Sequence, residues 1–126
     1  MVGFYGGHTV KSQCKRGEAM FKHAKKNHPS VEVFKGVVRT TLACGKDILM
    51  ARFDYKKGSQ VPPHRHSYEQ VTVLIKGKQK VIIENKGKKE EIILEEGDSY
   101  MVPASFEHQQ ISLEDTVTID SWSLAP

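Results

Sequence analysis

The chain has 126 residues, a hydrophobic content of 38% and a formal net charge of +4. This length allows one compact domain and is too short for two ordinary ones. No stretch approaches the roughly 20 consecutive apolar residues of a membrane-spanning helix, and the first residues lack the charged and apolar regions of a secretory signal. These features speak against a membrane or secreted protein and predict a cytoplasmic one.

The chain contains two cysteines, Cys14 and Cys44, which are 30 residues apart and form no C-x-x-C pair. Free buried thiols in a reducing compartment are the interpretation that we favour, in line with a cytoplasmic location. One disulfide, or a ligand role for a thiol, is the alternative.

Residues 1–30 form a basic segment. They contain six lysine or arginine residues and one acidic residue, Glu18, whereas residues 31–126 contain 13 basic and 14 acidic residues. We interpret residues 1–30 as a basic arm and residues 31–126 as the folded domain. No aromatic side chains alternate with the lysines as stacking surfaces, so a solvated arm is favoured, and nucleic-acid binding by the arm is the weaker hypothesis.

The stretch GEAMFKHAKKNHP, residues 17–29, is the single helix candidate within this arm. Met20, Phe21 and Ala24 would lie on one face of such a helix, and the proline at its end would stop it. A helix this short is only marginally stable by itself, so it must pack against the domain or fray.

From Val31 onward, short runs rich in β-forming residues alternate with turns. The runs are VVRTTLAC, DILMARFD, VTVLI, KVIIE, EEIIL, SYMVP, HQQISL and TVTIDSW. Glycines mark the turns between them, at positions that include Gly45, Gly58, Gly77, Gly87 and Gly97. Strands at intervals of roughly 8 to 12 residues with such turns predict an all-β sandwich or barrel.

Two of the six histidines, His64 and His66, are separated by one residue in the stretch PPHRHSYEQVTVLIKG, residues 62–77. Side chains alternate between the faces of a strand, so both histidines point to one side, and Gln70 joins them if the strand continues. His108 comes from a later strand, which can bring it opposite the pair. Imidazole nitrogens and an amide oxygen suit a borderline divalent metal ion. The pattern therefore predicts a metal site.

This arrangement resembles the two motifs of the cupins. The first motif, G-x5-H-x-H-x3-E-x6-G, is present as Gly58, His64, His66, Gln70 and Gly77. The second motif, G-x5-P-x-G-x2-H-x3-N, corresponds to Gly97, Pro103, Ser105, His108 and Ser112. The resemblance covers roughly residues 31–126 and implies a single cupin barrel, a jelly roll or double-stranded β-helix, with a metal held by His64, His66, Gln70 and His108. It also implies a homodimer, but no particular reaction, because cupins have many functions.

The chain departs from the family at three positions near the site, one of which is Tyr68, where close relatives often have a further histidine. Ser105 stands where the family has a turn glycine, which would alter that loop without removing His108. Gln70 replaces a glutamate, as in a subgroup of the family that ligates through this glutamine. Three neutral imidazoles and an amide bring no negative charge, so a divalent ion would keep its full charge and favour an anionic ligand such as a carboxylate. The donors suit Fe, Mn, Ni or Zn without choosing among them.

The last 14 residues, LEDTVTIDSWSLAP, resemble the C-terminal strand of small cupins that linearise unsaturated uronates in pectin and alginate breakdown. The pattern of those cupins is close to L-E-D-x-V-x-x-D-x-F-S-P-P-R. The resemblance implies that Asp120 is an acid–base carboxylate and that Trp122 contacts substrate, and strand parity places both on one face. A hydrogen-bonded strand residue and a core residue are the structural alternatives for these two positions.

The arginine that ends the family's pattern is missing, because this chain has Pro126 in its place. An arginine is the natural partner of a uronate carboxylate. Arg39, Arg52 or Arg65 would have to replace it, although Arg65 lies between two ligands and is expected to point outward.

The sequence therefore predicts a metal-binding cupin, and we expect a small metalloenzyme that acts on a carboxylate-bearing molecule such as a sugar acid by isomerase- or lyase-type chemistry. A metal-dependent dioxygenase is the alternative enzyme. A non-catalytic module that binds a small anion is the alternative outside enzymes.

Overall fold

The computed structural model describes residues 4–5, 8–9 and 21–123. Twelve strands and one 3-10 turn are present in these ranges. They are β1 (Phe4–Tyr5), β2 (His8–Thr9), η2 (Lys25–Asn27), β3 (Ser30–Phe34), β4 (Val37–Cys44), β5 (Ile48–Tyr55), β6 (Gln60–His64), β7 (Gln70–Lys76), β8 (Lys78–Asn85), β9 (Lys88–Glu95), β10 (Ser99–Val102), β11 (Glu107–Ser112) and β12 (Thr116–Ser123).

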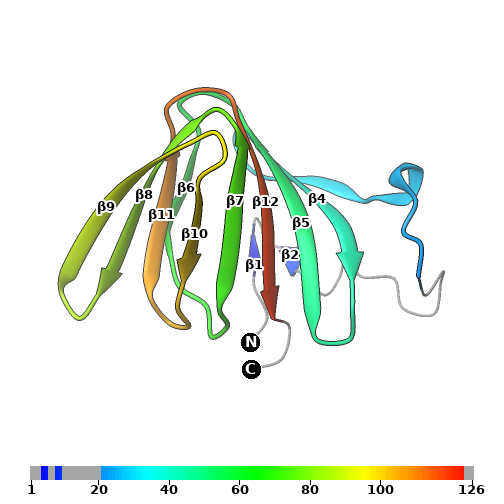
Figure 1. The fold of residues 1–126 in the computed structure, drawn as a ribbon, viewed down its shortest axis with the longest axis horizontal. Helices are drawn as coiled ribbons and strands as arrows, with labels where there is room; N and C mark the ends of the chain where they lie inside the picture. The colour runs from blue at the N-terminus through cyan, green and yellow to red at the C-terminus, as the bar shows by residue number, and fades with distance from the viewer. Residues whose placement is uncertain (1–3, 6–7, 10–20, 124–126) are drawn as a thin grey trace.

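The strands from β3 onward form two antiparallel sheets. The larger sheet has six strands in the order β10-β7-β12-β5-β4-β3, and the smaller one has four in the order β6-β11-β8-β9. Figure 1 shows the smaller sheet on the left and the larger sheet to its right. Strands that follow one another in the chain, such as β6 and β7, often belong to different sheets, as in a jelly roll. The predicted all-β barrel is therefore confirmed.

Alternating side chains of the larger sheet line its inner face. On β12, Thr116, Thr118, Asp120 and Trp122 are buried while their neighbours are partly exposed. The apolar part of the interior is a cluster that includes Leu49, Phe53, Tyr55 and Val61. Polar side chains are buried as well, so the interior can hold a site as well as a core.

Gly77 makes the sharp turn that leads from β7 in the larger sheet to β8 in the smaller one. Its φ angle is +102°, and a Cβ atom there would lie 2.7 Å from the Cα atom of Thr116. Glycine is required for both reasons, because other residues are strained at this φ and would collide with the start of β12.

The helix predicted for residues 17–29 is wrong over the part that the structure describes. Residues 21–29 contain only the 3-10 turn η2, and the Phe21 side chain is 94% exposed. Phe21 therefore does not pack against the core, and a short segment without such packing has too little stability for a helix. Residues 17–20 lie outside the described ranges.

Cys44 is disulfide-bonded, so the prediction of a free thiol is wrong at this position. The spacing of cysteines along the chain did not reveal this, because a disulfide depends on distance in space. Cys14 lies outside the described residues. Within the described part of the chain, we find no helix with the length and apolar character needed to cross a membrane.

Candidate metal centre

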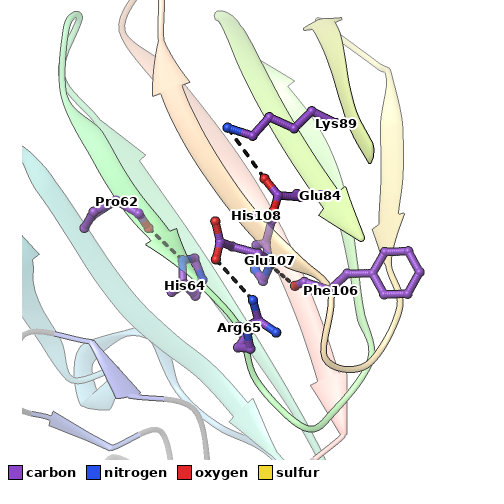
Figure 2. Close-up of polar contacts among 8 residues, drawn as sticks. All are labelled: Pro62, His64, Arg65, Glu84, Lys89, Phe106, Glu107 and His108. Atoms are coloured by element: carbon purple, nitrogen blue, oxygen red, sulfur yellow. Dashed lines mark hydrogen bonds and ion pairs between the residues drawn. The ribbon is translucent and has the colours of Figure 1, made fainter. Parts of the chain in front are cut away.

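The two predicted motifs come together where the smaller sheet faces the start of β7. His64 ends β6, and His108 lies on the neighbouring strand β11, directly opposite His64 in the strand register. Figure 2 shows His64 and His108 on these neighbouring strands, with His108 partly behind Glu107. His66 follows in the loop after β6, and Gln70 is the first residue of β7. The prediction of one strand that continues from His64 to Gln70 is therefore wrong: the strand ends at His64, and the loop between the two sheets brings the four predicted ligands to one place.

The three imidazoles are close enough to share one ion. One nitrogen from each ring lies within 4.8 Å of the others. The ring centres of His64 and His108 are 4.0 Å apart, and those of His66 and His108 are 4.7 Å apart. The side-chain oxygen of Gln70 lies 3.2 Å from Nε2 of His66. This is the spacing expected for donor atoms that surround a common centre.

The Nδ1 atoms of all three rings meet backbone carbonyl oxygens. His64 bonds to Pro62 at 2.9 Å, His66 to Tyr68 at 2.8 Å, and His108 to Phe106 at 3.0 Å. A carbonyl oxygen can only accept, so each Nδ1 must carry the proton. In a neutral ring, Nε2 then holds the free electron pair that a metal ion needs.

Burial keeps these rings neutral. Desolvation lowers the pKa of His64, His66 and His108, and the pKa of His108 falls to about 3 because the other two histidines add to the effect. The Nε2 atom of His108 is buried and has no hydrogen-bond partner among the described residues. An unsatisfied electron pair of this kind is costly unless something binds it. The residues therefore fit a divalent metal ion.

Gln70 is held at its nitrogen end by two other strand residues. Its Nε2 donates to Oγ1 of Thr72 and to Oδ2 of Asp120, both at 3.0 Å. Asp120 lies on β12, beside β7 in the larger sheet. The structure thus places the predicted acid–base residue in direct contact with a predicted ligand.

Asp120 is fully enclosed in the barrel. Its Oδ1 accepts a hydrogen bond of 2.7 Å from the hydroxyl of Thr118. Desolvation raises the pKa of Asp120 to about 7, although hydrogen bonds from Thr118 and Thr72 oppose this increase. Both protonation states of this carboxyl group are thus accessible near neutral pH.

Trp122 shares the inner face with Asp120, as strand parity predicts, and is buried. It forms part of an aromatic stack that sequence reasoning did not find. The ring of Tyr68 lies parallel to His66 at 4.1 Å between ring centres and stacks on Trp122 at 6.3 Å. The available signal was weak, because Tyr68 is only one residue of the loop between the two ligands His66 and Gln70.

The three arginines considered as carboxylate partners lie in different environments. Arg52 pairs with Asp54, and Arg65 pairs with Glu107, on the outside of the barrel. Figure 2 shows Arg65 directed at Glu107, so the prediction that it points outward is confirmed. Arg39, in contrast, is 0% exposed.

Arg39 belongs to the inner face of the larger sheet, since β4 buries alternate residues. Its charge lies near Tyr68 and opposes the increase in the pKa of Tyr68 that burial causes. Arg39 is therefore the arginine that the described structure places inside the barrel, near the aromatic stack.

Sequence reasoning also missed the polar residues behind Asp120. The hydroxyl group of Tyr100 contacts Thr72 and accepts a hydrogen bond of 3.3 Å from Gln110. Threonine and tyrosine are common in ordinary strands, so their types gave no signal. Only the pairing of the strands shows that these residues lie next to Asp120.

Comparison with known proteins gives one family match and many structural matches. Residues 51–119 match the cupin domain family. No curated protein sequence matches the chain.

Three solved structures illustrate the structural likeness. KdgF from Halomonas sp. is 25% identical, with 82% of this chain and 92% of that chain covered and a TM-score of 0.69. An RmlC-like cupin from Shewanella frigidimarina NCIMB 400 is 21% identical, with coverage of 85% and 93% and a TM-score of 0.73. Bacillus subtilis oxalate decarboxylase, a protein with Mn(II) centres, is 19% identical over 78% of this chain and 28% of its own, with a TM-score of 0.70.

Proposed function

Because the chain belongs to the cupin family, we propose that it is a small metal-dependent enzyme that acts on a carboxylate-bearing molecule such as a sugar acid. The reaction would be of the isomerase or lyase type. The observation that carries this proposal is a group of three neutral histidines that could hold a metal ion, close to a buried carboxyl group. That group is Asp120, which contacts the predicted ligand Gln70. The resemblance of the C-terminal stretch to uronate-linearising cupins supports the same direction.

His64, His66 and His108 would hold the ion through Nε2, with Gln70 supplying an oxygen. These donors suit Fe, Mn, Ni or Zn. A bound ion of this kind polarises a carbonyl or hydroxyl oxygen of the substrate and, with neutral ligands around it, favours an anionic partner.

Asp120 would move the proton. A general acid or base works best when its pKa is near the working pH, and burial brings the pKa of Asp120 to about 7. The aromatic stack of His66, Tyr68 and Trp122 would form one wall of the substrate site, with Trp122 in contact with substrate. Aromatic rings supply a large apolar contact area for a sugar-like ring.

Arg39 would bind the substrate carboxylate in place of the missing C-terminal arginine. A guanidinium group matches a carboxylate with two parallel hydrogen bonds, and inside a barrel such a pair is poorly screened. The hydroxyl group of Tyr68 is buried without a hydrogen-bond partner among the described residues, so it can donate to the same anion.

The test is an assay of unsaturated and saturated sugar acids with the metal-saturated protein. We expect turnover by the parent, a loss of at least 100-fold in kcat with Asp120→Asn, and an increase mainly in KM with Arg39→Lys. Asp54→Asn, a surface change of the same type, serves as the control. Tight binding of sugar acids without product would instead indicate the non-catalytic module, and oxygen consumption matched to substrate would indicate the dioxygenase.

We also propose that the protein is a homodimer, and its outer surface supports this. Exposed apolar side chains gather on the outer face of the larger sheet, namely Ile48, Met50, Val71, Ile75 and Met101. A hollow of about 530 Å³ is lined by residues of β7, β10 and β12, which include Val71 and Met101. Apolar patches of this kind are typical of protein–protein contacts.

A further inference from the structure

We propose that Asp120 and Thr72 are positioning residues for Gln70, and that together they orient its amide so that the oxygen faces the metal centre. This inference rests on the ligand set of the proposed function and is independent of the substrate. It gives Asp120 a role in metal binding in addition to its proposed role in proton transfer.

The amide group of Gln70 has two N–H bonds, and both have acceptors. One acceptor is Oγ1 of Thr72 and the other is Oδ2 of Asp120, each 3.0 Å away. The oxygen end lies on the opposite side, 3.2 Å from Nε2 of His66. Gln70 is 1% exposed, so water does not compete for these positions.

This fixation matters because a glutamine, unlike a glutamate, has only one end that can ligate a metal ion. The two ends of an amide are nearly equal in size, so shape alone does not choose between them. A flipped amide would place its oxygen about 3 Å from Oδ2 of the ionised Asp120, where two acceptors repel, and would leave Thr72 without its donor. The two acceptors therefore select the orientation in which Gln70 can bind metal.

The same contact explains why glutamine, and not the glutamate of the common cupin motif, suits this barrel. A glutamate at position 70 would place one carboxylate against another in a buried setting, which is unfavourable for both. Glutamine supplies an oxygen to the ion and a donor to Asp120 at the same time. Residues 70 and 120 are thus a matched pair across two neighbouring strands.

The experiment is a cobalt(II) titration of the full chain, with binding followed by the visible d–d absorption and by competition with a chelator. Asp120→Asn removes the charged acceptor, and Thr72→Val removes the neutral one without any change of charge. We expect Asp120→Asn to weaken cobalt affinity about 10- to 100-fold and Thr72→Val about fivefold. The absorption spectrum of the bound cobalt should change in both variants.

Two matched controls separate positioning from general disturbance. Thr118→Val is the same substitution on a threonine that contacts Asp120 but not the amide of Gln70. Asp54→Asn neutralises an exposed aspartate that pairs with Arg52. We expect both variants to bind cobalt within about twofold of the parent, since neither removes an acceptor of the amide.

A charge-exchange variant provides the rescue. Gln70→Glu alone should lower the melting temperature of the metal-free protein, because it brings two carboxyl groups together. Gln70→Glu combined with Asp120→Asn restores one donor and one acceptor at the contact, so its melting temperature should exceed that of the single variant. This measurement needs neither metal nor activity.

The outcomes distinguish this inference from the proposed function. If the parent binds no cobalt, the ligand set fails and the inference fails with it. If the parent binds cobalt and Thr72→Val leaves the affinity and the spectrum unchanged, the inference that these residues orient the Gln70 amide is wrong. Any effect of Asp120→Asn would then come from its charge alone. A double variant no more stable than Gln70→Glu would also overturn the matched pair.

Discussion

His108 illustrates how a single residue is prepared for metal binding. It is 1% exposed, its Nδ1 donates to the carbonyl oxygen of Phe106, and its Nε2 has no hydrogen-bond partner in the part of the chain that the structure describes. Burial of such a ring lowers the stability of the metal-free protein, because Nε2 loses its contact with water and gains no partner among the described residues. The same features favour the binding of a metal ion.

Protonation of His108 should therefore cost the metal-free protein stability in acid. The pKa of His108 is about 3 when folded and near the ordinary 6.5 when unfolded, so the unfolded state takes up the proton first as pH falls. This part of the stability is fully present above pH 6.5 and is lost progressively between pH 6.5 and 3. Relative to the parent, His108→Gln should become more stable as pH is lowered from 7.5 to 5.

Urea unfolding at several pH values measures this difference. Effects of Asp120 and of the other histidines largely cancel when variant and parent are compared at the same pH. A constant difference in unfolding free energy across this range would show that His108 titrates alike in both states.

Ser105 is a second residue with a clear energetic consequence. Its φ angle is +68°, so the serine adopts a left-handed backbone conformation that favours glycine, and its N–H donates to the carbonyl oxygen of His66 at 2.7 Å. Ser105→Gly should therefore raise the free energy of unfolding by about 0.5–1 kcal/mol, since relief of strain exceeds the entropy cost of glycine. Ser105→Ala keeps the strain, and a gain of similar size in that variant would contradict this explanation.

At the scale of elements, two glycine turns differ in what they require. Gly77 connects the two sheets and lies against β12, whereas Gly87 closes the β8–β9 hairpin with a φ of +80° and open space around it. The hairpin needs glycine for its backbone conformation alone. The connection between sheets needs it for space as well.

Substitution by alanine should separate these two requirements. Gly87→Ala should cost about 1 kcal/mol of unfolding free energy, which reflects backbone strain. Gly77→Ala should cost about 2–3 kcal/mol or more, because the new methyl group also collides with Thr116 and the backbone before it. Chemical denaturation of both variants checks this order, and equal costs would mean that the strand start adjusts freely.

At the scale of the whole molecule, the proposed dimer would form through the outer face of the larger sheet. Val71 on β7 is 51% exposed and Met101 lies beside it on β10, in register with it. Val71→Lys combined with Met101→Lys should convert the dimer to a monomer, because buried unpaired charges oppose association. Light scattering coupled to size exclusion measures the mass.

The control for this prediction is Ile93→Lys, a similar change at an exposed apolar residue of β9 in the smaller sheet. It should leave the dimer intact. A parent protein that is already monomeric at high concentration would contradict the proposal, and a dimer that survives the double substitution would place the interface elsewhere.

The sequence by itself predicted most of the strands, their turns and the three histidines that the structure brings together. Hydrophobic runs between glycine turns indicate the strands, and the spacing of the two motifs picks out the three histidines, although His66 lies in the loop after β6 and not on a strand. Strand parity likewise gave the shared face of Asp120 and Trp122. Each of these features depends on residues close together in the chain or on a motif of fixed spacing.

Only the tertiary structure decided which distant residues meet. The contact between Gln70 and Asp120 spans 50 residues, and it depends on β7 and β12 being neighbours in the larger sheet. Burial of Arg39 and the stacking of Tyr68 on His66 and Trp122 have the same origin. Local pattern also gave a wrong helix around Phe21, because a helix this short needs a partner surface that the sequence does not specify. The type of a side chain determines which interactions it can form, and the pairing of strands determines which other residues lie close enough to take part.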